Sequence, residues 1–232
     1  MKNVIKIFLL TIMSLFIAVA AENTEVNGSP KLSEIEYKSI IVNGNKEFKL
    51  EKPVFKDNVK YAEVNKKINE IVDEKKWSKY EKELAKEKDL YSKPYVDFGS
   101  IITYYDSDII SILFSADVYL GGAHGGHPVN SIVINRKTGK EITSDILGSN
   151  KKDAFDKIYK IIKEDKEQVF FDTDEMEITR EEIEKKAVLT YTSKDIINIF
   201  FNEYSVAPYT TGTPEFNYNM KTKKITFVDG SY

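Results

Sequence analysis

The strongest constraint on the fold is an alternating stretch near the middle of the chain. Apolar residues occupy every second position from Ile110 to Leu120, and most positions between them carry serine, aspartate or tyrosine. A period of two residues places successive side chains on opposite faces of a β-strand. The stretch therefore predicts a β-strand with one apolar face and one largely polar face.

Short polar turns separate the neighbouring strand patterns. Asn43-Gly44-Asn45 separates residues 35–42 from 47–50, and Pro53 is expected to end this unit. Asp106-Ser107-Asp108 separates residues 96–104 from the alternating stretch. Short connections join antiparallel strands, because parallel strands need a crossover of a dozen or more residues. We therefore expect an antiparallel sheet.

Two regions have helical periodicity instead. Residues 64–84 carry apolar side chains three and four positions apart, with a break around Asp73-Glu74, and a second apolar stripe begins after Asn150. Thr179 and Glu182 form a capping-box pattern that opens a shorter helix. The sequence predicts an α+β fold with an antiparallel sheet, a long helix in the N-terminal half and a second helix in the C-terminal half.

The N-terminus has the three-part layout of a secretory signal peptide. Lys2 and Lys6 precede an apolar run over residues 7–17, and small alanines follow. The run is shorter than the roughly 20 residues that a membrane-spanning helix needs. We expect a signal peptide at residues 1–21, a flexible tether at 22–33, and an exported protein, periplasmic or secreted, with no stable membrane span after cleavage.

The remaining residues are expected to form two halves, 34–125 and 126–232, that share one core. The chain has no cysteine, which excludes disulfides, thiol nucleophiles and cysteine metal sites. Of its 34 basic residues, Lys2 and Lys6 belong to the signal peptide, so 32 face 37 acidic residues, a net charge of −5. An acidic exported protein is a poor candidate for nucleic acid and a reasonable one for a cationic protein partner.

The alternating stretch leads into a loop that contains both histidines of the chain, Gly121-Gly122-Ala123-His124-Gly125-Gly126-His127-Pro128. Three interpretations are open. The loop is a structural turn or binding loop, which we favour; or His124 and His127 bind a metal with a carboxylate from elsewhere; or a histidine acts as a catalytic base. No G-x-S-x-G pattern supplies a nucleophile, and we expect neither a metal nor a cofactor.

A second loop, Tyr204 to Gly212, places two tyrosines around Pro208. Tyrosine rings have an apolar face and a polar tip, so they suit stacking on sugars. The alternative, which we favour, is that both rings pack at the edge of the domain while the proline fixes the turn.

These two loops resemble a known module. Tyr119-Leu120-Gly121-Gly122-Ala123-His124-Gly125, then Thr138-Gly139-Lys140, and later Tyr204-x-x-Ala207-Pro208-Tyr209-x-x-Gly212 are similar to a paired module of exported bacterial proteins. This module forms the extracellular part of RsiV-type anti-sigma factors and stands beside the catalytic domain of PdaC-type peptidoglycan deacetylases. The resemblance extends from about Ile35 to Val228.

The resemblance implies a binding module of the cell envelope. The module is the lysozyme receptor in RsiV-type proteins, so the implied ligand is a lysozyme-like cationic protein or an envelope glycan. Only Met1 to Lys6 precede the apolar run, so we do not expect the cytoplasmic sigma-binding segment of RsiV-type proteins; nor do we find the deacetylase catalytic domain. We predict a non-enzymatic binding protein, with an envelope hydrolase or metal protein using His124 and His127 as the alternative. The predicted ligand-binding residues are Tyr119, Gly121, Gly122, His124, Gly125, Tyr204, Pro208 and Tyr209.

Overall fold

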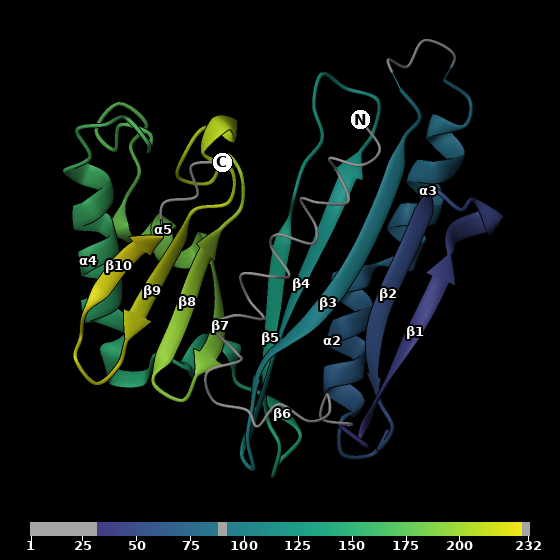
Figure 1. Cartoon of the computed structure of the whole chain (residues 1–232), viewed down its shortest axis with the longest axis horizontal. Helices are drawn as coiled ribbons and strands as arrows, with labels where there is room; N and C mark the ends of the chain where they lie inside the picture. The colour runs from purple at the N-terminus through teal and green to yellow at the C-terminus, as the bar shows by residue number, and fades with distance from the viewer. Residues whose placement is uncertain (1–31, 88–91, 229–232) are drawn as a thin grey trace, which may run out of the picture.

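The computed structural model describes residues 32–87 and 92–228 (Figure 1). The predicted signal peptide and most of the predicted tether lie outside the described residues. Among the residues described, no helix is long and apolar enough to cross a membrane.

The described residues form two sheets (Figure 1). The first sheet has six strands in chain order: β1 (Ile35–Ile41), β2 (Phe48–Phe55), β3 (Tyr95–Tyr105), β4 (Ile109–Tyr119), β5 (Val129–Asn135) and β6 (Lys140–Glu141). The second sheet has four strands in the order β10 (Ile225–Val228), β9 (Glu215–Asn219), β8 (Ile196–Phe201) and β7 (Ala187–Ser193).

The helices accompany one sheet each. Helices α2 (Ala62–Val72) and α3 (Glu74–Leu84) lie over the first sheet, and α4 (Lys151–Lys163) and α5 (Arg180–Lys186) belong to the second (Figure 1). The break expected around Asp73 is confirmed, because this residue adopts a left-handed conformation with φ 39° between α2 and α3. The capping box is also confirmed, since Thr179 and Glu182 bond to each other's backbone at the start of α5.

The α+β class is confirmed, but the expectation of a purely antiparallel sheet is wrong. Strands β2 and β3 are parallel, with Phe48 opposite Val96, whereas the other strand pairs of the first sheet are antiparallel. The long helical segment between β2 and β3 supplies the crossover that a parallel pair requires. The segment predicted to be helical is helical, and α2 and α3 form the connection between these two parallel strands.

The prediction that Pro53 ends its hairpin is also wrong. Pro53 lies inside β2, opposite Tyr37 of β1. Strand β3 pairs with β2 only at Phe48 to Leu50, so Pro53 lies where β2 has a single neighbouring strand. Proline is tolerated at such positions because the ladder on one side is already absent.

Where one shared core was expected, the buried hydrophobic residues form two clusters. The first core lies between the first sheet and helices α2 and α3, and includes Phe48, Ile68 and Phe114. The second core lies between the second sheet and helix α4, and includes Phe155 and Phe216. Strand β5 contributes to both, because Ile132 and Ile134 belong to the first core and Val133 to the second. The predicted boundary between residues 125 and 126 stays a prediction.

The two sheets meet along a line of hydroxyl groups, which we call the seam. Strand β7 contacts β3, β4 and β5, on the face of the first sheet away from α2. The Thr190 hydroxyl lies 2.6 Å from that of Thr103 and 2.7 Å from that of Ser111. Ser131 donates to the Leu189 carbonyl at 2.6 Å. The seam therefore consists of Thr103, Ser111, Ser131 and Thr190, all buried.

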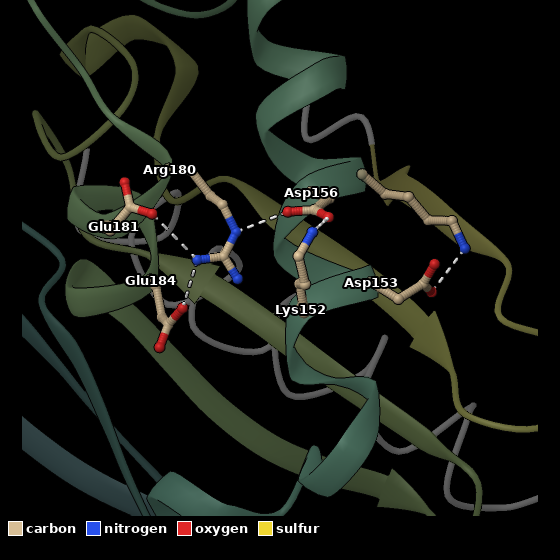
Figure 2. A network of polar contacts seen from close by, with 7 residues as sticks. Lys152, Asp153, Asp156, Arg180, Glu181 and Glu184 are labelled. Atoms are coloured by element: carbon tan, nitrogen blue, oxygen red, sulfur yellow. Dashed lines mark hydrogen bonds and ion pairs between the residues drawn. The ribbon is translucent and has the colours of Figure 1, made fainter.

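A surface network attaches α5 to α4 (Figure 2). The Arg180 guanidinium reaches Asp156 of α4 at 2.8 Å and Glu184 of its own helix at 3.0 Å, and Lys152 pairs with the same Asp156. These contacts hold the pKa of Asp156 below its usual value. The network positions the short helix that leads directly into β7.

Candidate functional site

The glycine-histidine loop continues the β4–β5 hairpin and folds tightly against β4. Val118 and Gly126 exchange backbone hydrogen bonds of 3.0 and 2.8 Å. A side chain at Gly125 would place its Cβ atom 2.7 Å from the Val118 carbonyl oxygen, and Gly121 has a φ of +91°. Both positions therefore require glycine for the chain to turn this closely.

His124 connects this loop to the second loop. Its Nδ1 lies 2.7 Å from the Gly125 carbonyl oxygen, which accepts a hydrogen bond, and its Nε2 lies 3.2 Å from the Tyr204 hydroxyl. Its ring also packs on Tyr209, with 4.1 Å between ring centroids. In the neutral tautomer with hydrogen on Nδ1, both ring nitrogens of His124 have a partner. The two loops predicted as one surface are thus in direct contact.

The second loop is anchored from below and exposed at its tip. Val206 and Ala207 are buried in the second core, and Pro208 precedes a 3₁₀ turn over Tyr209–Thr211, η5. Tyr204 has a φ of +63° and keeps 55 % of its surface exposed. Its ring stacks on Tyr209 with centroids 6.1 Å apart. The anchoring residues hold Tyr204 out toward solvent.

His127 lies between two carboxylates that come from different halves of the chain. Its Nδ1 is 2.9 Å from Glu203, which follows β8, and its Nε2 is 3.6 Å from Asp117 of β4. The carboxylate side chains are only 12 % and 10 % exposed, whereas His127 is 38 % exposed. Because a carboxylate accepts, Nδ1 of His127 carries the hydrogen in its contact with Glu203.

A second pair of tyrosines borders Asp117. The Tyr95 hydroxyl donates to Asp117 at 3.0 Å, and the Tyr95 ring stacks on Tyr119 at 6.2 Å. Burial and the nearby Asp117 charge raise the pKa of Tyr95 to about 12. Burial also raises the pKa of Tyr209, with further contributions from Glu203, Tyr204 and Asp117. Tyr95 and Tyr209, one from each tyrosine pair, are therefore in the field of the carboxylates.

Asn202 fixes the distance between the two loops. Its side-chain oxygen accepts from the Val129 backbone N–H at 2.7 Å, and its side-chain nitrogen donates to the Val129 carbonyl at 3.1 Å. Asn202 thus bonds to the start of β5 as a neighbouring strand would. This contact holds Glu203 and Tyr204 beside the glycine-histidine loop.

All the predicted site residues lie on these two loops or at the end of β4. Tyr119 donates to the Gly122 carbonyl at 2.9 Å, so this member of the second tyrosine pair also supports the loop. Sequence reasoning missed Tyr95, Asp117 and Glu203 as members of the site. Two signals were available, because Glu203 directly precedes Tyr204, and Asp117 is a charged residue two positions before Tyr119 on the same strand face.

We call the combined set the two-loop site: the carboxylates Asp117 and Glu203, the histidines His124 and His127, and the tyrosines Tyr95, Tyr119, Tyr204 and Tyr209. Within the described ranges, no group of three or more His, Cys, Asp or Glu side chains is arranged to hold a metal ion. The chemistry that the set offers is aromatic surface, hydrogen bonds and negative charge.

Comparison with protein families gives one match in each half. Residues 42–127 match the family described as "Deacetylase PdaC", and residues 144–217 match the "Protein of unknown function (DUF3298)" family. The prediction of paired domains of this kind is confirmed. The likeness to RsiV-type proteins stays a prediction. His124 and His127 lie within the first match, and Tyr204, Pro208 and Tyr209 lie within the second.

Two solved structures are similar to this chain. A DUF3298 family protein from Pseudomonas aeruginosa PAO1 shares 14 % identity over 78 % of this chain and 88 % of its own, with a TM-score of 0.48. A DUF3298 family member from Bacteroides fragilis NCTC 9343 shares 18 % identity over 81 % of this chain and 91 % of its own, with a TM-score of 0.44. The comparison with curated proteins gave no match.

Proposed function

We propose that this chain is an exported, non-enzymatic binding protein of the bacterial cell envelope that recognises a lysozyme-like protein or an envelope glycan through the two-loop site. One observation carries the proposal. His124, from the first family match, bonds Tyr204 and packs on Tyr209, both from the second match, so the two halves build one surface.

The charge of the site favours the cationic protein as ligand. Asp117 and Glu203 place negative charge beside four tyrosine rings, and tyrosine is enriched among the residues that dominate protein–protein binding. Charge complementarity speeds association and selects partners. The exposed ring of Tyr204 would also stack on a sugar, so a glycan is the second ligand to test.

Calorimetric titration with a cationic animal-type lysozyme at moderate salt tests the proposal. We expect saturable binding by residues 22–232, weakened at least about tenfold in Tyr204→Ala, because an exposed aromatic anchor is lost. Tyr37→Ala is the matched control, since Tyr37 is similarly exposed, at 46 %, on β1. Heat with peptidoglycan fragments and none with lysozyme would assign the glycan, and no heat with either would contradict the proposal.

A hydrolase is the second candidate, and the orientation of His127 is what favours it. A histidine whose Nδ1 donates to a carboxylate, as His127 does to Glu203, has the arrangement of an oriented general base. Release of soluble fragments from peptidoglycan, abolished in His127→Gln and retained in Tyr204→Ala, would support hydrolysis. Equal release by wild type and His127→Gln would exclude a role for this histidine as the base.

A further inference from the structure

The two-loop site brings the carboxylates of Asp117 and Glu203 to the same histidine, His127. The single imidazole of His127 can offset at most one of the two negative charges that these carboxylates carry when both are ionised. Among the described residues, no lysine or arginine forms an ion pair with either carboxylate. Charge removed from water is costly unless a counter-charge accompanies it.

Four other partly buried carboxylates of this protein each have a lysine or arginine partner. Glu34 and Glu184, each 26 % exposed, pair with Arg136 and with Lys151, respectively. Glu141 and Asp195, 28 % and 31 % exposed, pair with lysines. Asp117 and Glu203 are less exposed than any of these, and their ion-pair partner is His127. Within the part of the chain that the structure describes, this least exposed pair of acids has no lysine or arginine beside it.

The aromatic residues around the carboxylates suit the same kind of ligand. Tyr95 of β3 stacks on Tyr119 of β4, and Tyr204 stacks on Tyr209 in the second loop. The faces of tyrosine rings attract ammonium and guanidinium groups, with more effect where water is excluded. The site remains open from outside, because His127 and Tyr204 keep 38 % and 55 % of their surface exposed.

We propose that the two-loop site binds a basic side chain, lysine or arginine, of the protein partner, with Asp117 and Glu203 supplying the counter-charge and the tyrosine pairs supplying the walls. The inference rests on the proposed binding function and names the chemical group that the site takes. A guanidinium fits best, because its planar face stacks on tyrosine while its edge bonds carboxylates.

Small cations test the site without any protein partner. The probe is N-acetylargininamide, its uncharged isostere N-acetylcitrullinamide is the control, and the readout is the imidazole NMR signal of His127. The chain has two histidines, so His124→Gln assigns the signals. We expect a saturable shift with the arginine probe in the millimolar range and none with the citrulline probe.

The variant Asp117→Asn with Glu203→Gln removes both charges and keeps the side-chain shapes, and its fold is checked by circular dichroism. The arginine-induced shift should disappear in it. An unchanged shift in this variant, equal shifts with both probes, or no shift at tens of millimolar would overturn the inference. A shift with Ca²⁺ but not with the arginine probe would overturn it in favour of a metal site.

Titration with lysozyme then separates the inference from the proposed function. The double variant should bind lysozyme about 30-fold more weakly than wild type, because a desolvated charge pair is lost. Asp174→Asn with Glu175→Gln removes two charges from an exposed loop elsewhere and should change the affinity less than about threefold. Equal weakening in both double variants would overturn the inference, whereas the proposed function of lysozyme binding would stand. Failure of wild type to bind lysozyme, with the arginine shift present, would overturn the lysozyme partner and leave the basic-side-chain site standing.

Discussion

The two cores and the seam are both buried, but they are built from different groups. The cores consist of hydrophobic side chains that lie against helices, such as Phe114 in the first and Phe155 in the second. The seam consists of the hydroxyls of Thr103, Ser111, Ser131 and Thr190, which bond one another or the backbone of the facing strand. Hydrophobic burial is non-directional, whereas hydrogen bonds require set distances and angles. The cores therefore stabilise each sheet, and the seam fixes the position of one sheet on the other.

The largest effect is expected in a core. Phe155 of α4 is fully buried, so Phe155→Ala should lower the free energy of unfolding by about 3–5 kcal/mol through lost transfer energy and the cavity left behind. Urea denaturation measures the change. Phe155→Leu is the matched control and should cost less, because most of the volume is kept. A loss below that of the seam variant described last would contradict the assignment of stability to the cores.

The next effect depends on pH and concerns the face of the second sheet that carries Thr190. Glu215 of β9 lies on this face beside Asn198, which donates to it. Burial raises the pKa of Glu215 to about 7. Between the unfolded and the folded pKa the unfolded chain loses its proton while the folded chain keeps it, so stability falls as pH rises.

From pH 5 to pH 8 this group should remove roughly 2–3 kcal/mol of unfolding free energy, and Glu215→Gln should abolish that loss. Urea denaturation across this range measures it. Glu184→Gln is the contrasting control, because a Lys151 contact lowers the pKa of Glu184 and its removal should destabilise the protein at neutral pH. Identical pH profiles for wild type and Glu215→Gln would show that Glu215 ionises freely in the folded protein.

The smallest effect is expected in the seam. Thr190→Val removes the hydroxyl that bonds Thr103 and Ser111, and should cost about 1–2 kcal/mol because the remaining hydroxyls keep other partners. Each single variant leaves the other threonine hydroxyl facing a valine methyl group. The double variant Thr103→Val with Thr190→Val removes both hydroxyls, so its loss of unfolding free energy should be smaller than the sum of the two single losses. Strict additivity in urea denaturation would show that these hydroxyls act independently.

The contrast between the cores and the seam also explains how much of the fold could be predicted from the sequence. The apolar face of β4 was predictable, because alternation of residue type reflects burial directly. Its opposite face is largely polar in sequence, yet Ser111 and Asp117 are buried there, and alternation alone does not predict that. Ser111 meets Thr190, which lies 79 positions later in the chain, and no local pattern contains that contact.

The candidate site also combines residues that could be predicted from the sequence with residues that could not. His124, Tyr204 and Tyr209 stood out through glycine and proline signals in their own loops, and the structure brings these loops together. Asp117 and Glu203 carry no such signal, because a single carboxylate on a strand or in a loop is ordinary. Their role as the charged centre follows only from the approach of β4 to the end of β8.

Strand β5 has a consequence for cooperativity. Its side chains alternate between the two cores, with Val133 in one and its neighbours Ile132 and Ile134 in the other. Any opening that displaces β5 therefore exposes apolar surface on both sides, so an opening of the first sheet that includes β5 also uncovers part of the second core. The protein should therefore melt in a single cooperative transition. Trp77, the one tryptophan of the chain, lies in the first core, and its fluorescence should change together with the unfolding of both the first and the second sheet.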